Sequence, residues 1–250
     1  MNDITNSAAI PYLTTGQMIE VDRAMMEDYR IELIQMMENA GRNLAQLART
    51  RFLGGDPVGK PVTVLAGTGG NGGGALVAAR RLHNWGARVE AFVTKPDEAF
   101  APVPAHQLGI LRRMGVPVTI GAPEGAGGPS PAMGGVILDG VIGYSLRGDP
   151  RGTAAGLIGW ANAAGAPVLS LDVPSGVDAG SGKVYDPAIR ATATMTLALP
   201  KEGLRAPGVA GYVGELYLAD ISVPPGLYGQ PALGLAVGPL FAREEILRLA

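Results

Sequence analysis

Residues 61–86 read PVTVLAGTGGNGGGALVAARRLHNWG, and this stretch decides the fold. The apolar run at 61–67 predicts a buried strand, and residues 75–86 predict a helix that ends at Gly86. The glycines of residues 67–74 let the backbone turn sharply and approach a ligand closely. The start of the following helix offers unpaired N–H groups to an anion, so the unit predicts a pyrophosphate site.

Besides a pyrophosphate site, the glycine loop has two other interpretations: the first stays open and the second is disfavoured. A tight turn between strand and helix needs no ligand at all. An ordinary NAD-dependent dehydrogenase wants an acidic residue at the end of the second strand, about twenty residues further on. That strand ends here in Thr94-Lys95, and Glu90 lies in its middle, so the dehydrogenase is disfavoured.

The alternation of strands and helices continues beyond this stretch and predicts an α/β fold with a mainly parallel sheet. An N-terminal helix pair begins at Thr14 or Thr15 and continues with a helix over about 32–51. Residues 1–250 are expected to form a single domain, with 1–13 as a loose lead-in and 121–135 as a partly mobile loop. The other expected strands are 87–94, 117–120, 191–199 and 213–219, while 135–143 and 166–176 are each expected to hold a strand and its turn. The other expected helices are 106–115 and 154–165.

Composition excludes several classes of protein. The net charge is −2 without a basic stripe, so neither nucleic acid nor a membrane is expected as a partner. There is no signal peptide pattern at the N-terminus and no apolar run long enough to span a bilayer. The chain has no cysteine, which excludes disulfides and cysteine nucleophiles and fits a reducing, cytoplasmic location.

Two aspartates follow apolar runs, at GVILD and PVLSLD. In a parallel sheet Asp139 and Asp172 would emerge at the same edge as the glycine loop, where a shared site is expected, although an aspartate there can also be only a turn former. The D-V-P-S-G turn presents Ser175, but the two histidines are expected on helices away from it, so a hydrolase triad is disfavoured. A hard cation held by Asn71, Asp139 and Ser175 suits these oxygen-bearing residues better.

Five segments in order resemble the NAD(P)H-hydrate epimerase family, also called the YjeF N-terminal domain. The match covers nearly the whole chain. The segments are MIEVDRAM with MMENAGRNLAQLAR, VLAGTGGNGGGALVAARRL, DGVIGYSLRG, LDVPSGVDAGSG, and LALPKEGLRAPG with GYVGELYLADISVPP.

The resemblance implies a Rossmann-like three-layer sandwich, often a homodimer, that interconverts the two C6 epimers of hydrated NADH and NADPH (NADHX and NADPHX). A separate dehydratase, specific for one epimer, would complete the repair. The family's potassium ion would be held by Asn71, Asp139 and Ser175, and Asp172 would contact the substrate and act as its acid/base group. Lys201 is expected either to orient an anionic group or to be a solvated surface lysine. The implied substrate-binding residues are Gly70, Asn71, Gly72, Gly73, Gly74, Gly143, Tyr144, Ser145, Leu146, Arg147, Gly148, Asp149 and Asp172.

The chain departs from the family pattern inside these segments. Gly70 and Gly74 stand where the family usually has asparagine and aspartate, and Tyr144-Ser145 stands where it tends to have threonine and glycine. Thr192 stands where an aspartate is common. Two alternatives therefore remain beside the epimerase: a non-catalytic nucleotide-binding or scaffold module, and an enzyme for a different nucleotide-like or isoprenoid-like substrate.

Overall fold

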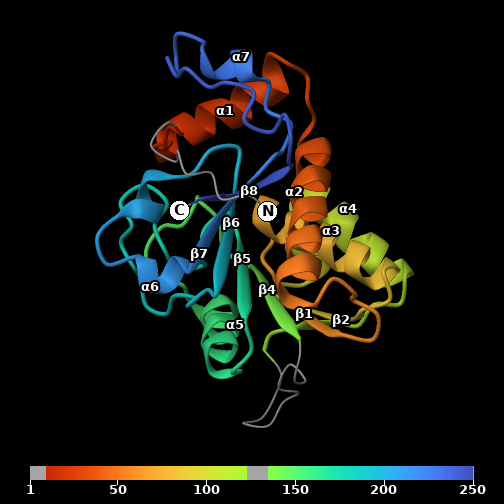
Figure 1. Cartoon of the computed structure of the whole chain (residues 1–250). Helices are drawn as coiled ribbons and strands as arrows, with labels where there is room; N and C mark the ends of the chain where they lie inside the picture. Colours follow the sequence, from red (N-terminus) through yellow and green to blue (C-terminus); the bar gives the residue numbers. More distant parts are fainter. Residues whose placement is uncertain (1–9, 123–134, 250) are drawn as a thin grey trace.

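The structure, a computed structural model, describes residues 10–122 and 135–249. Its centre is an eight-stranded sheet in the order β3-β2-β1-β4-β5-β6-β7-β8 (Figure 1). Every neighbouring pair is parallel except β7 and β8, which are antiparallel. The strands are β1 Pro61–Ala66, β2 Arg88–Val93, β3 Val118–Ile120, β4 Val136–Gly140, β5 Val168–Leu171, β6 Ala193–Leu197, β7 Glu215–Ala219 and β8 Ile246–Leu249.

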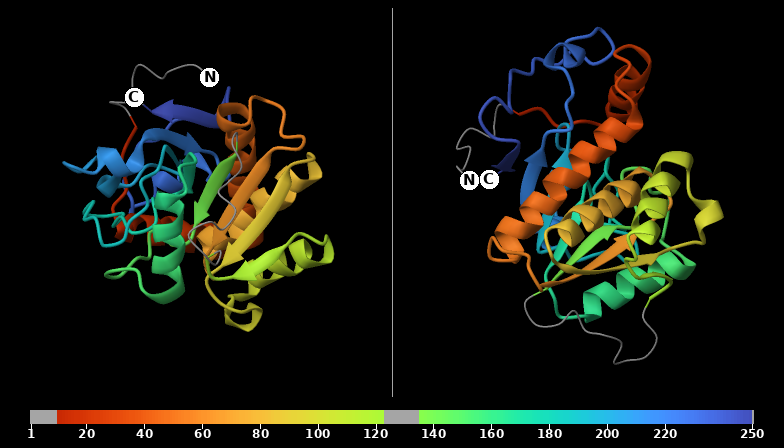
Figure 2. Two further views of the ribbon diagram at one scale, coloured as in Figure 1. Left: turned by 90° about the horizontal axis from the view of Figure 1, so that it is seen from below. Right: turned by 90° about the vertical axis from the view of Figure 1, so that its right-hand side faces the viewer.

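Helices cover both faces of this sheet, as the two turned views show (Figure 2). The helices α2, α3 and α4 lie over one face, and α5 lies over the other. This arrangement confirms the predicted Rossmann-like three-layer sandwich. The helices are α1 Thr15–Glu27, α2 Leu33–Leu47, α3 Gly70–Asn84, α4 Pro102–Arg113, α5 Gly152–Ala163, α6 Ala210–Val213 and α7 Pro225–Tyr228.

The apolar side chains of β1 pack into two hydrophobic cores, one on each face of the sheet. Val62 and Val64 pack with the α3 side chains, whereas Leu65 packs with Leu157 and Ile158 of α5. Successive side chains of a strand point to opposite faces, so a central parallel strand is apolar at nearly every position. That is why PVTVLA reads as a continuous apolar run instead of an alternating one.

Several predicted boundaries differ from the observed ones, and three of them concern the ends of helices. The helix expected at 75–86 begins at Gly70, so most of the glycines lie in its first turns. The helix expected at 106–115 begins at Pro102, whose fixed φ and missing N–H suit a first helical turn. The second N-terminal helix ends in a π-helical turn at Ala48–Phe52.

The two ends of the described chain are packed onto the sheet. Leu13, expected in a loose lead-in, is fully buried and its N–H donates to the carbonyl of Pro200 at 2.8 Å. The antiparallel strand β8 was not expected, because its run of four residues shows no clear alternation. Residues 1–9 of the lead-in and most of the glycine-rich loop at 121–135 lie outside the described residues. No helix among the described residues has the length and apolar character needed to cross a membrane.

Candidate active site

A cleft of about 1050 Å³ opens at the carboxyl edge of the parallel strands, beside the ends of β1, β4 and β5. The helices after β1 and β4 cover opposite faces of the sheet, so this edge is the switch point where doubly wound folds bind ligands. The helices α1 and α2 form the facing wall, and α1 lies across the carboxyl ends of the strands (Figure 1). The volume is at the upper end of the range for small-molecule sites, which suits a ligand as large as a dinucleotide.

The glycine loop passes directly from β1 into the first turn of α3. A Cβ on Gly72 would lie 1.8 Å from the carbonyl oxygen of Gly67, so the turn has no room for a side chain there. Gly70 lines the cleft and has open space around its Cβ position. The first amides of a helix lack intrahelical partners, so this wall of the cleft can bind an anion.

Gly73 and Gly74, predicted to bind substrate, do not line the cleft. A Cβ on Gly73 would lie 2.4 Å from the sulfur of Met37 on α2, and one on Gly74 would lie 2.8 Å from a methyl carbon of Leu171. Both glycines are buried where α3 packs closely against α2 and β5. Their place in the structure is therefore one of helix packing.

Asn71 joins the first turn of α3 to the neighbouring strand ends. Its Nδ2 donates to the carbonyl oxygen of Leu171 at 2.7 Å. Its Oδ1 lies 2.7 Å from the position that a Cβ on Gly143 would take, so the loop after β4 approaches this amide closely. The next residue back, Ile142, donates its N–H to the hydroxyl of Ser175 at 2.8 Å. Asn71 and Ser175 thus contact adjacent residues of one loop.

Asp139 is fully buried behind the cleft and is held by donors on both oxygens. Its Oδ1 accepts from the Ser175 hydroxyl at 2.5 Å and from the N–H of Val141 at 3.2 Å. Its Oδ2 accepts from the Ser170 hydroxyl at 2.8 Å and from the Ser175 N–H at 2.9 Å. Burial raises the pKa of Asp139, and the hydrogen bonds from Ser175 and Ser170 oppose that rise.

The three predicted cation ligands therefore lie in one neighbourhood, with Asp139 and Ser175 in direct contact. Their side chains, with the carbonyl oxygen of Ile142 that lies 3.2 Å from the Ser175 hydroxyl, provide a carboxylate and several neutral oxygens. Oxygen donors of this kind fit a hard cation of low charge.

Asp172 lines the cleft at the end of β5 in an unusual backbone conformation. Its φ is +68°, a left-handed value that costs a non-glycine residue about 1–3 kcal/mol and often marks a functional site. Its Oδ1 accepts from the Thr196 hydroxyl and from the N–H of Leu197, each at 3.3 Å, and from the ammonium of Lys201. Among the described residues Oδ2 has no hydrogen-bond partner, which leaves it to face a ligand.

Lys201 is fully buried, so its interpretation as a solvated surface lysine is wrong. Its ammonium donates to Oδ1 of Asp172, to the carbonyl oxygen of Leu197 at 2.8 Å and to the hydroxyl of Thr196 at 3.4 Å. These three acceptors match the three N–H donors of the ammonium. Lys201 thereby fixes the Asp172 carboxylate and balances its charge.

Asp22 is a cleft residue that the sequence interpretation missed. It lies on α1, and its Oδ2 accepts from the hydroxyl of Tyr144 at 2.5 Å. Burial raises the pKa of Asp22, and the negative charge of Asp172 adds to this effect while Lys201 and the hydrogen bond from Tyr144 oppose it. Burial and the nearby carboxylates of Asp22 and Asp172 raise the pKa of Tyr144 above its usual range. The charges and hydrogen bonds of these cleft side chains therefore influence one another's pKa values. The side chains are Asp22, Tyr144, Asp172 and Lys201.

The predicted substrate loop at 143–149 reaches the cleft only with its first residues. Gly143, Tyr144 and Ser145 line the cleft, whereas Leu146, Arg147, Gly148 and Asp149 do not. Instead, Asp149 accepts a hydrogen bond from the N–H of Asp186 at 3.3 Å, on the outside of the site. The start of α5 lines this part of the cleft wall instead, through Arg151, Gly152 and Thr153.

The residues missed at the sequence level carry no local signal of their own. One aspartate on an amphipathic helix, as Asp22 is, reads as part of a solvated face. Arg151 and Thr153 reach the cleft only because α5 begins there, and neither is an acidic residue at the end of a strand. The family-like segment MIEVDRAM, which contains Asp22, was the available hint.

Comparison with known proteins identifies a matching family model and several similar proteins. The model of the family "YjeF-related protein N-terminus" matches residues 33–203. An NAD(P)H-hydrate epimerase of Dehalogenimonas lykanthroporepellens is 42% identical over 94% of this chain and 91% of its own length. One of Truepera radiovictrix is 38% identical over 84% of this chain and 90% of its own.

A longer relative and a solved structure also match this chain. A bifunctional NAD(P)H-hydrate repair enzyme of Salinibacter ruber is 35% identical over 86% of this chain but only 41% of its own length. The crystal structure of the yeast protein ynu0 superposes with a TM-score of 0.77 at 25% identity, covering 96% of this chain and 100% of the yeast chain. The fold, the order of the segments and these matches agree, and the chain belongs to the YjeF-related protein N-terminus family.

Proposed function

We propose that this protein is an NAD(P)H-hydrate epimerase, which interconverts the R and S forms of NADHX and NADPHX in the repair of nicotinamide cofactors. Relatives of almost the same length carry that name, and the chain aligns with more than nine tenths of the first of them. The observation that carries the chemistry is Asp172, a cleft residue in a left-handed conformation whose Oδ1 is bound by buried Lys201 and whose Oδ2 has no hydrogen-bond partner among the described residues.

The cleft supplies the parts that such a reaction needs. The first turn of α3 offers amides to the pyrophosphate of the ligand. Inverting C6 requires a bond at that carbon to break and re-form with proton transfer. A positioned carboxylate such as Asp172 contributes about a hundred- to ten-thousand-fold to a step of this kind.

We further propose that Asn71, Asp139 and Ser175 hold a potassium ion. The oxygen donors around the loop after β4 support this assignment. When bound, the cation would supply positive charge beside the phosphate-binding turn and fix the geometry of that loop. The homodimer, the cytoplasmic location and a separate dehydratase as functional partner are proposals that rest on the family resemblance.

A second candidate is an enzyme of the same fold for a different nucleotide-like substrate. It is favoured by Tyr144, which occupies part of the cleft where the family tends to have a small residue. Both candidates predict nucleotide binding, but only the first predicts turnover of hydrated NADH.

The test is the rate at which purified R-NADHX is converted to the S form, followed by chromatography in potassium chloride and in choline chloride. Spontaneous conversion is measured in a blank without protein. The Asp172→Asn variant keeps the shape of the side chain and should lose at least about a hundredfold in rate. A folded wild-type protein that gives no acceleration over the blank contradicts the epimerase assignment.

A further inference from the structure

The hydrogen bond between Tyr144 and Asp22 joins the two walls of the cleft. Tyr144 lies on the loop after β4, at the sheet edge, whereas Asp22 lies on α1, which crosses that edge. The donor–acceptor distance of 2.5 Å is at the short end for an O–H group bound to a carboxylate oxygen. Asp172 approaches the same cleft from the end of β5.

Epimerisation at C6 asks for two proton transfers. When the bond from C6 to the hydroxyl oxygen breaks, that oxygen takes up a proton and leaves as water, and the ring nitrogen shares its electron pair with C6. Water then adds to the opposite side of C6 and gives up a proton. One group must therefore donate a proton to the departing oxygen, and another must accept a proton from the adding water. These two oxygens lie on opposite faces of the ring, so a group on one side cannot reach both of them well.

Resting on the proposed function, we propose that Tyr144 is the second proton-transferring group of the cleft and that Asp22 is the residue that positions and recharges it. In the step that starts from the Asp172 carboxylate and protonated Asp22, Tyr144 gives its hydroxyl proton to the departing oxygen and takes the proton of Asp22 in its place. The Asp172 carboxylate, paired with the ammonium of Lys201, takes the proton of the water that adds on the other side of C6. In the reverse direction the two roles exchange, so protons balance and no oxidant or reductant is required.

The surroundings of the pair support a proton-handling role. Tyr144 and Asp22 are both partly buried in the cleft wall, which keeps their hydrogen bond away from bulk water. Burial raises the pKa of Asp22, and the negative charge of Asp172 adds to that rise, so Asp22 takes up a proton more readily than an exposed aspartate does.

The experiment compares kcat and KM for NADHX epimerisation in wild type, Tyr144→Phe, Asp22→Asn and the double variant. Phenylalanine keeps the ring and removes only the hydroxyl. Each single variant should lose about a hundredfold in kcat with KM changed less than about threefold, and the double variant should lose hardly more, because the two residues act as a unit.

The matched control is Tyr217→Phe. The hydroxyl of Tyr217 donates to the carboxylate of Glu215 at 2.7 Å, so the same kind of bond is removed from β7, outside the cleft. Its kcat should stay within about twofold of wild type. A Tyr144→Phe variant that retains kcat, or that changes KM alone, overturns the proton-transfer role while leaving the epimerase assignment intact. An inactive wild type overturns both.

Discussion

Lys201 and Asp172 form a buried ion pair between two loops that follow neighbouring parallel strands, β6 and β5. Neither side chain has appreciable contact with solvent, and the lysine has no other carboxylate partner among the described residues. Removing one member of such a pair leaves an uncompensated charge in the protein interior, which is far more destabilising than losing an exposed ion pair.

The Lys201→Met variant should therefore lose about 3–5 kcal/mol of unfolding free energy. The measurement is urea denaturation followed by fluorescence. The double variant Lys201→Met with Asp172→Asn removes both charges, so it should be more stable than Lys201→Met alone. Equal stability of these two variants would show that the buried charge is not the cause of the loss.

Ser175 should be important for both folding and the response to potassium. Ser175→Ala removes a donor to Asp139 and leaves the N–H of Ile142 without its acceptor. Since an unsatisfied buried polar group costs about 1–3 kcal/mol, the variant should lose that much stability. It should also lose any difference in epimerisation rate between potassium chloride and choline chloride.

A serine elsewhere on the chain serves as the control for Ser175. The hydroxyl of Ser181 donates to Asp178 at 2.7 Å in an exposed turn. Ser181→Ala should change stability by less than about 0.5 kcal/mol, as surface substitutions usually do, and should keep the potassium response. A Ser175→Ala protein that still responds fully to potassium contradicts the proposed ligand set.

Two glycines of one loop should respond oppositely to the same substitution. Gly72→Ala would bring a methyl group to 1.8 Å from a backbone oxygen, so the turn must move and stability should fall by at least about 2 kcal/mol. Gly70→Ala meets open space at a helix start and should be neutral or stabilise by up to about 1 kcal/mol. Thermal unfolding of both variants decides the matter, and a similar Tm for the two would contradict the packing argument.

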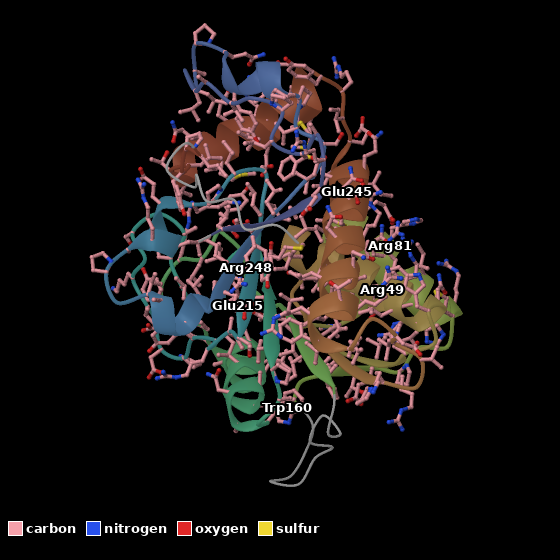
Figure 3. All side chains as sticks on the ribbon, viewed as in Figure 1. Arg49, Arg81, Trp160, Glu215, Glu245 and Arg248 are labelled. Atoms are coloured by element: carbon pink, nitrogen blue, oxygen red, sulfur yellow. The ribbon has the colours of Figure 1, made fainter. Side chains whose placement is uncertain are left out.

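Glu215 should contribute to the acid sensitivity of the fold. It lies on β7, with Arg248 on the neighbouring strand β8 (Figure 3). Its hydrogen bonds from Arg51 lower the pKa of Glu215 to about 2. A carboxyl group with a lower pKa in the folded state stabilises the fold above its unfolded pKa, and that contribution is lost as pH falls from about 4.3 toward 2.

The variant Glu215→Gln should accordingly show a shallower fall of unfolding free energy than wild type over this acidic range. Urea denaturation at pH 5, 4 and 3 gives the two slopes. Parallel curves for wild type and variant would mean that Glu215 does not titrate differently on unfolding.

Much of the fold was predictable because the apolar patterns of the strands and helices are bounded by glycine-rich turns. The apolar run at 61–66 and the glycines after it sufficed to predict a parallel strand and a phosphate-binding turn. The start of α3 was misplaced because glycine has a low helix propensity, which close packing against Met37 and Leu171 overrides. The last strand, β8, exists through its pairing with β7, and no short-range pattern reports such a long-range partner.

The candidate site was predictable in part, for the same reason. Asp139 and Asp172 were found because they end apolar strands, and topology brings the ends of parallel strands together. The burial of Lys201 and the reach of Asp22 to Tyr144 depend on how a loop and a helix dock, which the local sequence does not encode. Docking is a tertiary property, so a charged residue involved in it looks like any surface charge until the structure is known.

The position of Asp22 on α1 shows that this helix contributes side chains to the cleft, so substitutions in α1 can change which ligands the cleft binds. The helix α1 ends at Glu27 and forms one wall of the cleft together with α2, whereas Asp139 and Asp172 lie at strand ends on the sheet side. Substitutions along α1 can change the shape and polarity offered to a ligand without disturbing the strand ends that carry Asp139 and Asp172. A directed-evolution library restricted to the cleft-facing positions of α1 would therefore explore new substrate preferences on a chemically unchanged sheet edge.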